Sequence, residues 1–209
     1  IIHGTTLATN ALIERKGART ALVTTEGFRD SLEIAYEHRF EQYDLFMERP
    51  APLVDRDWRF PVPERLAADG PGRRERYRAA LRALAADLGK TAVEAVAVCF
   101  LHSYVNSDHE RRAGAILAEA LGEVSISLSA EVCPEIREYD RASTACANAY
   151  VQPMIAGYLR RLESGLRAAG LACPLLLMMS SGGVTTVDCE APHADHPKTR
   201  QNRVAEYRA

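Results

Sequence analysis

Lysine, tryptophan and long apolar runs are scarce in this sequence. Its lysines are Lys16, Lys90 and Lys198, its other basic residues are arginines, and its net charge is −2 with a pI near 6.3. Without an excess of positive charge, there is no electrostatic reason to expect nucleic acid or a membrane surface as a partner. The sequence has no apolar run of about 18 residues, the minimum for a membrane-spanning helix, and no signal peptide. A cytoplasmic protein is therefore expected.

Cysteines are present but not in the pairs that bind metals or form redox motifs. No Cys-x-x-Cys occurs among the five, which are Cys99, Cys133, Cys146, Cys173 and Cys189. We therefore expect reduced thiols, with Cys99 and Cys173 in apolar surroundings.

Strand-like and helix-like patterns alternate along the 209 residues, which suffice for one large domain, or one and a part, with a hydrophobic core. Apolar runs predict buried strands at 1–2, 19–25 and 93–101, further strands at 124–128 and 174–179, and an edge strand at 58–62. Helical periodicity predicts helices at 7–14, 28–35, 73–88, 107–121 and 135–170, with a break or kink near Gln152, before Pro153. This order predicts an α/β fold whose sheet is covered on both faces.

The first strand-helix junction carries the clearest candidate site. Gly4 allows a tight turn, Thr5 or Thr6 can cap the helix, and Gly17 can end it. Such a turn directs backbone N–H groups and hydroxyls at one point, where an anion or a carbonyl oxygen can bind. Many α/β proteins use a Thr-Thr pair only to cap a helix, so this alternative stays open.

Two later junctions offer further candidates. His102 and Ser103 follow a predicted strand, and the carboxyl ends of strands are where ligands collect in open α/β sheets. His102 can equally hydrogen-bond a neighbouring loop, and Ser103 lacks the Gly-x-Ser-x-Gly surroundings typical of serine hydrolases. The turn at 180–183, Ser-Ser-Gly-Gly, can expose N–H groups to a ligand oxygen or can simply be a hairpin or loop.

Charged side chains crowd the start of the last predicted helix, at Glu135, Arg137, Glu138, Asp140 and Arg141. The pattern alone indicates a solvated helix face with ion pairs worth about a few tenths of a kcal/mol each.

Five segments together resemble the hydantoinase A / 5-oxoprolinase family. The run HGTTLATNALIERKGARTALVTTEGFRDSLEI is similar to the family's opening region, with its near-identical His-Gly-Thr-Thr-x-Ala-Thr-Asn-Ala-Leu segment. The other segments follow in the family's order, at 43–45 with 49–50, 97–110, 127–153 and 175–184. Several motifs in order are far more specific than one. The resemblance covers residues 1 to about 188.

This resemblance implies an actin-like, ribonuclease H-like ATPase lobe and an ATP-dependent activation of a cyclic amide, imide or ketone. The carbonyl oxygen would be phosphorylated before water or a carboxylate-type nucleophile attacks. Ring opening of hydantoins or 5-oxoproline and carboxylation of ketones all occur in the family. The implied cofactors are ATP and Mg²⁺, and the implied partner is a hydantoinase B-type subunit or domain.

Pocket residues also follow from the resemblance. It implies that His3, Thr5, Thr6 and Asn10 line the pocket, with hydroxyls and nearby N–H groups donating to a substrate or phosphate oxygen. The remaining candidates for the substrate or nucleotide pocket are Gly4, His102, Ser103, Glu138, Arg141, Asn148, Ser181, Gly182 and Gly183. No residue is assigned to catalysis.

Both glycine-rich phosphate loops of that superfamily are missing from the sequence. Relatives carry an Asp-x-Gly-Gly-Thr-type hairpin before the point corresponding to Ile1, and a Ser-Gly-Pro-Ala-Gly-Gly-type segment after the Ser-Gly-Gly turn. Neither occurs here, and no Walker A sequence replaces them. Because phosphoryl transfer depends on positioning and charge neutralisation, this chain alone is expected not to turn over ATP. The expected alternatives are a fragment of such a hydrolase, a non-catalytic remnant, or a split subunit whose partner supplies the loops.

We expect three regions along the chain. Residues 1–140 correspond to the family's N-terminal domain, 141–188 to the start of the hydantoinase A/oxoprolinase domain, and 189–209 to a divergent, disordered tail. In this tail Cys189, His193, Asp195 and His196 are suitable ligand types, but their surroundings lack the pattern of a folded segment, so no metal site is predicted.

Overall fold

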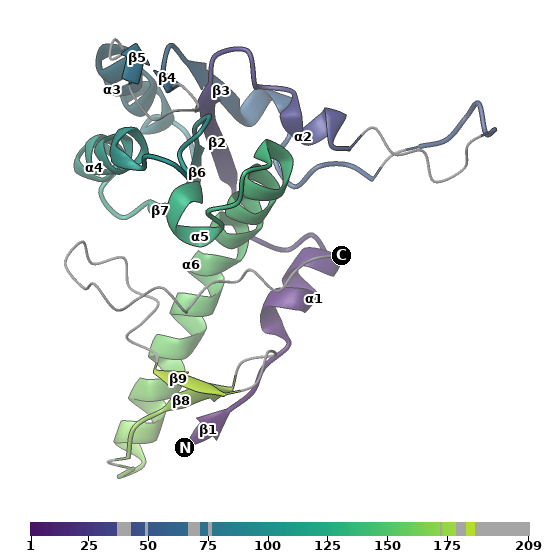
Figure 1. The fold of residues 1–209 in the computed structure, drawn as a ribbon. Coiled ribbons are helices and arrows are strands. Elements are labelled where there is room, and N and C mark those ends of the chain that lie inside the picture. The colour runs from purple at the N-terminus through teal and green to yellow at the C-terminus, as the bar shows by residue number, and fades with distance from the viewer. Residues whose placement is uncertain are drawn as a thin grey trace.

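Helices and strands alternate along the chain in the computed structural model (Figure 1), which describes residues 1–36, 43–48, 50–66, 72–74, 77–171, 173–178 and 183–186. The strands are β1 Ile2–His3, β2 Thr20–Thr25, β3 Arg59–Val62, β4 Arg65–Leu66, β5 Gly72–Arg74, β6 Ala95–Cys99, β7 Ser125–Leu128, β8 Leu176–Met178 and β9 Val184–Thr186. The helices are α1 Leu7–Ile13, α2 Ser31–Ile34, the 3₁₀ turn η1 Arg56–Trp58, α3 Tyr77–Leu88, α4 Asp108–Leu121, α5 Ser129–Val132 and α6 Glu138–Ala168.

A four-stranded parallel sheet in the order β3-β2-β6-β7 forms the centre of the molecule. Every residue of β2 and β6 is buried, as expected for strands covered on both faces. β3 lies at the edge, where Pro61 need not donate a ladder hydrogen bond. The expected α/β architecture is confirmed.

Helices cover both faces of this sheet because successive strand residues point to opposite sides. On one face Val96 and Val98 of β6 pack against Leu81 of α3 and Leu117 of α4. On the other face small side chains from β6 and α6 meet, which allows the helix to approach the sheet closely. These are Ala95, Ala97, Ala142, Ala145 and Ala149.

A second, smaller sheet lies farther along α6 (Figure 1). In its order β1-β8-β9, β1 and β8 are parallel and β9 is antiparallel to β8. α6 connects the two regions, since its 31 residues make a rod of about 46 Å. None of the helices in the described ranges has both the length and the apolar composition needed to cross a membrane.

Several local predictions were wrong. Ile1 and Ile2 are 42% and 58% exposed, not buried, because the small sheet leaves them on its surface. Helix α2 begins only at Ser31, and α3 begins at Tyr77 after the strand β5. Cys173, expected in apolar surroundings, is exposed.

Pro153 does not interrupt α6, contrary to the predicted break. Proline removes one helical hydrogen bond, but packing on both sides can hold the helix. Gln152 Oε1 accepts hydrogen bonds from Ser125 Oγ at 2.7 Å and Ser127 Oγ at 3.3 Å, which fastens this turn of α6 to β7.

A close contact at Gly17 yields a stability prediction. A Cβ at this position would lie 2.1 Å from the ring of Tyr150, which is buried against α1, so Gly17→Ala should lower the free energy of unfolding by about 1–3 kcal/mol. Gly165→Ala, in an exposed turn of α6 with open space around it, should raise it by about 0.5–1 kcal/mol. Urea denaturation of both variants measures whether the free energy of unfolding changes in these opposite directions. Equal stability of Gly17→Ala and the unaltered chain would contradict the close contact between Gly17 and Tyr150.

Candidate functional site

Two segments far apart in the sequence meet at the carboxyl ends of β1 and β8. The strands are parallel neighbours, with Ile2 opposite Leu176 and His3 opposite Leu177. The turn Gly4-Thr5-Thr6 therefore leaves the sheet at the same edge as the end of β8. Gly183, which precedes β9 with φ +88°, returns the chain to this edge because Val184 pairs with Met178. We call this place the β1–β8 edge; Ser181 and Gly182 lie outside the described residues.

The Gly-Thr-Thr turn at the β1–β8 edge is open to solvent. Thr5 Oγ1 accepts a hydrogen bond from Leu7 N at 3.1 Å, so Thr5 supplies the hydroxyl that caps the start of α1. The side chain of Thr6 makes no such cap bond and is exposed. A Cβ placed on Gly4 would meet nothing within 4 Å. The turn thus offers a hydroxyl and unhindered backbone to an incoming oxygen atom.

His3 and Asn10 flank this turn. His3 Nε2 lies 3.0 Å from the hydroxyl of Tyr158 on α6, which holds the imidazole against the helix. Asn10 lies one helical turn beyond Thr6, with its N–H bonded to the Thr6 carbonyl at 2.9 Å and its side chain exposed.

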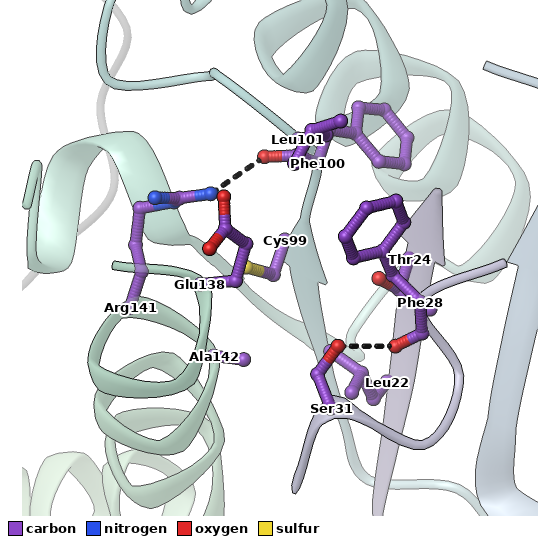
Figure 2. A pocket seen from close by; sticks show the side chains of 10 residues that line it. All are labelled: Leu22, Thr24, Phe28, Ser31, Cys99, Phe100, Leu101, Glu138, Arg141 and Ala142. Carbon is purple, nitrogen blue, oxygen red and sulfur yellow. Dashed lines mark hydrogen bonds between the residues drawn. The ribbon is translucent and has the colours of Figure 1, made fainter. Parts of the chain in front are cut away.

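A second group of candidates surrounds the carboxyl end of β6. Figure 2 shows a narrow pocket there, between the ends of β2 and β6 and the first turn of α6. It is lined by Leu22, Thr24, Phe28, Ser31, Cys99, Phe100, Leu101, Glu138, Arg141 and Ala142. The enclosed space holds about one water molecule, so this pocket does not fit a nucleotide.

Arg141 joins α6 to the end of β6. Its side chain is fully buried, and Nη1 donates to the carbonyls of Glu135 at 2.7 Å and Ile136 at 3.2 Å. Nη2 donates to the carbonyl of Phe100 at 3.0 Å (Figure 2). The guanidinium also lies over the ring of Tyr104, 5.5 Å from its centroid. These contacts hold the chain before α6 against the sheet.

Ser103 is a member of a buried hydrogen-bond chain. Its Oγ lies 3.3 Å from Ser129 Oγ, which donates to Glu110 Oε1 at 2.6 Å. His102 adopts φ +58°, a left-handed conformation that is unfavourable for a non-glycine residue, and its Nδ1 is buried without a hydrogen-bond partner in the described part of the chain. Ser103 therefore has structural hydrogen bonds and not the histidine contact of an activated nucleophile.

Asn148 points from α6 toward β7. Its Nδ2 donates to Ser127 Oγ at 2.9 Å, which adds to the bonds that Gln152 makes with the same strand.

The candidates consequently form two groups and not one pocket. Arg141 and Tyr158 are 17 residues apart on α6, or about 26 Å along its axis. The β1–β8 edge lies beside Tyr158, and the narrow pocket lies beside Arg141.

Sequence reasoning missed the buried polar groups that hold the carboxyl edge of the central sheet. Thr25 Oγ1 donates to Glu64 Oε2 at 2.7 Å and accepts from Leu101 N at 3.0 Å. His109 Nδ1 lies 2.6 Å from Glu64 Oε1. The sequence signal that could have revealed this group was a pair of polar residues, His109 and Glu110. They lie on the face of an amphipathic helix that otherwise carries apolar residues.

Glu110 lies beside this group and is also fully buried. Besides the Ser129 hydroxyl, its carboxylate accepts hydrogen bonds from Phe100 N at 2.7 Å and Ala130 N at 2.8 Å. Burial raises the pKa of Glu110, and the hydrogen bonds from Ser129, Ala130 and Phe100 oppose this shift. We call Thr25, Glu64, His109 and Glu110 the polar brace.

The described residues do not make a complete nucleotide or metal site. In the parts of the chain that the structure describes, no three metal-ligating side chains cluster. Cys189, His193, Asp195 and His196 lie outside those parts. The β1–β8 edge suits one phosphate or carbonyl oxygen, but neither it nor the narrow pocket fits ATP and Mg²⁺ as a whole.

A parallel sheet covered on both faces, joined by a long helix to a second, smaller sheet, defines the chain as an α/β lobe. The family model described as the hydantoinase/oxoprolinase N-terminal region matches residues 1–121, and that described as hydantoinase/oxoprolinase matches residues 141–194. The chain belongs to the hydantoinase/oxoprolinase family, as its motifs predicted.

Known relatives share this similarity over most of the chain. Caprolactamase subunit alpha from Pseudomonas jessenii is 37% identical over 185 residues, covering 88% of this chain and 27% of that protein. The 5-oxoprolinase of Saccharomyces cerevisiae is 34% identical over 208 residues, covering 87% of this chain and 16% of that protein. The gamma subunit of acetophenone carboxylase from Aromatoleum aromaticum is 33% identical over 200 residues, covering 88% of this chain and 27% of that protein.

The fold agrees with these matches. The crystal structure of ATP-dependent caprolactamase from Pseudomonas jessenii matches with a TM-score of 0.80 at 36% identity, over 89% of this chain and 27% of that one. The architecture is consistent with an actin-like ATPase lobe. The chain spans between 16% and 27% of the length of these relatives.

The buried carboxyl of Glu110 predicts a pH effect. Because the pKa in the folded state is raised above the ordinary value, the folded chain binds more protons than the unfolded chain between the two pKa values. The free energy of unfolding should therefore fall as pH rises through this window. In Glu110→Gln the fall with pH should disappear. Because one hydrogen-bond acceptor is lost, the free energy of unfolding of this variant at neutral pH should also be lower by about 1–3 kcal/mol.

Urea denaturation between about pH 4 and pH 8 measures this effect. Glu119→Gln, at an exposed position on the same helix, is the matched control and should follow the unaltered chain. Parallel curves for Glu110→Gln and the unaltered chain would exclude a titrating Glu110 in that window.

Proposed function

We propose that the protein to which this chain belongs opens a cyclic amide or imide, of the hydantoin or 5-oxoproline type, in an ATP-dependent reaction. The observation that carries this proposal is the β1–β8 edge, where Gly4-Thr5-Thr6 and Gly183 lie at the same edge of the small sheet, on either side of β8. The similarity to caprolactamase and to 5-oxoprolinase, both of which act on cyclic amides by name, supports it.

The Gly-Thr-Thr turn suits the oxygen of a lactam carbonyl. When a nucleophile attacks such a carbonyl, negative charge develops on its oxygen, and fixed donors aimed at that oxygen lower the barrier. Thr6 is the best-placed donor, because its exposed hydroxyl makes no cap bond. The bare Gly4 lets the substrate approach the backbone closely.

ATP is the proposed co-substrate, with Mg²⁺ as its counter-ion. The described residues fit one oxygen of substrate or phosphate, so we assign no further step of the nucleotide chemistry to them.

Two regions are proposed, 1–140 and 141–188, followed by a divergent tail at 189–209, of which residues 189–194 lie inside the second family match. The break between the two family matches, at residues 121 and 141, supports a division in this part of the chain.

We also propose a companion subunit, of the hydantoinase B type. The caprolactamase relative is an alpha subunit and the acetophenone carboxylase relative a gamma subunit, so both work in assemblies of several polypeptides. Such a subunit could supply groups that the described residues lack.

Ketone carboxylation is the second candidate function. The 33% identity to the acetophenone carboxylase subunit over 88% of the chain supports it. The same oxygen site would then accept the oxygen of a ketone.

A substrate panel separates the two reactions. The complete protein is assayed with ATP and Mg²⁺ and with 5-oxoproline, hydantoin, caprolactam, or acetophenone plus bicarbonate. We expect ADP and a ring-opened acid from a cyclic amide without bicarbonate. ADP formation only with ketone and bicarbonate would replace the proposal by the carboxylase, and no stimulation by any compound would contradict both.

Thr6→Ala tests the assigned donor. Loss of one donor to a developing oxyanion typically lowers the rate by roughly 100-fold, so kcat/KM for the cyclic amide should fall by about that factor. Thr6→Ser, which keeps the hydroxyl, should recover most of the activity. Ser164→Ala, which removes an exposed hydroxyl from α6, should have no effect. Near-normal turnover by a folded Thr6→Ala protein would remove Thr6 from the site.

A further inference from the structure

Tyr158 of α6 contacts the strand that leads into the Gly-Thr-Thr turn. Its hydroxyl lies 3.0 Å from His3 Nε2, and the centroids of the two rings are 5.7 Å apart. Successive residues of a strand point to opposite faces of its sheet, so the half-buried His3 faces α6 while Ile2, 58% exposed, points away from it. The two bonded residues are 155 positions apart, so this contact forms only because the small sheet lies against α6.

The Gly-Thr-Thr turn is held by α6 at both of its ends. Before the turn, His3 is bonded to Tyr158. After the turn, Ala11 of α1 packs against Tyr150 and Val151 of α6. A turn that is fixed on both sides keeps its donors in place when a ligand arrives, which lowers the cost of binding.

The contact with Tyr158 uses one of the two ring nitrogens of His3. The other nitrogen, Nδ1, has no hydrogen-bond partner in the described part of the chain. In a neutral imidazole one nitrogen donates and the other accepts, so a hydroxyl that donates to Nε2 leaves the ring proton on Nδ1. The bonds that leave the two nitrogens diverge, so an N–H at Nδ1 is directed away from Tyr158. Nδ1 is also the ring nitrogen nearer to the main chain, which continues directly into Gly4.

We propose that Tyr158 is a positioning residue that donates to His3 Nε2 and so holds the proton of His3 on Nδ1, where it donates to the carbonyl oxygen of the substrate. A carbonyl oxygen that gains negative charge is stabilised by fixed donors. The opposite tautomer would present a lone pair, which repels this oxygen. Thr6 is three residues from His3, within about 11 Å along the chain, so both side chains can serve one ligand.

This inference rests on the oxygen site proposed above, but not on whether the substrate is a cyclic amide or a ketone. Tyr158→Phe is the sharpest variant, because it removes the hydroxyl and keeps the ring that packs beside His3. Tyr150→Phe is the matched control. Tyr150 lies on the same helix, and its hydroxyl makes no hydrogen bond within the residues that the structure describes.

Nitrogen NMR of the complete protein with isotope-labelled histidine shows which ring nitrogen carries the proton. The spectra are recorded at about pH 8, where imidazole side chains are mostly neutral, and the signals that disappear in His3→Ala belong to His3. We expect the Nδ1–H form in the unaltered protein and in Tyr150→Phe, and a shift toward the Nε2–H form in Tyr158→Phe. An Nε2–H form in the unaltered protein, or no change in Tyr158→Phe, would overturn the proposal.

A double-mutant cycle separates positioning from a merely structural role. With the carbonyl substrate found by the substrate panel, Tyr158→Phe should lower kcat/KM about tenfold, as is typical when the hydrogen bond behind a working histidine is lost. Tyr150→Phe should leave kcat/KM unchanged. In the His3→Ala protein, Tyr158→Phe should have no further effect, because it acts through His3. An equal loss in both backgrounds, or none in either, would overturn the proposal.

Failure of the proposed function gives a different result. The complete protein would then turn over no compound of the panel, while the NMR spectra would still decide whether Tyr158 sets the proton of His3.

Discussion

The carboxyl edge of the central sheet depends on the burial of two neighbouring side chains, His109 and Glu110, at the start of α4. His109 reaches Glu64, and Glu110 reaches the backbone of Phe100 and Ala130, so one helical turn joins the ends of several strands. A buried polar group that loses its partner costs about 1–3 kcal/mol, and a buried charge costs more. Thr25 and His109 both bind the carboxylate of Glu64, and Glu110 binds backbone N–H groups instead, so every buried carboxylate of the polar brace has hydrogen-bond partners.

The fixed edge in turn fixes α6. Phe100 presents its N–H to Glu110 and its carbonyl to Arg141, so the polar brace and the first turn of α6 are tied to the same residue. Alanines on both sides let α6 lie close to the sheet, and the hydrogen bonds of Gln152 hold it to β7 past Pro153. A rigid α6 then carries Tyr158, which orients His3 at the β1–β8 edge. α6 thereby connects the β1–β8 edge to the central sheet.

This arrangement separates two parts of the chain. The central sheet and its polar brace form the buried core, and the β1–β8 edge leaves the Gly-Thr-Thr turn open to solvent. The relatives that share this lobe are several times longer than this chain.

The sequence by itself determined the family, the alternation of strands and helices, and the edge position of the strand with Pro61, because these follow from motif order, residue periodicity and local backbone chemistry. It also indicated the Gly-Thr-Thr turn. Only the tertiary structure decided that this turn lies at the same edge of the small sheet as Gly183, since pairing of distant strands leaves no local signal. The charged start of α6 resembled a solvated face, yet Arg141 is buried, because carbonyls from other segments replace its water. Partners of a buried polar group come from the fold, so periodicity alone could not reveal them.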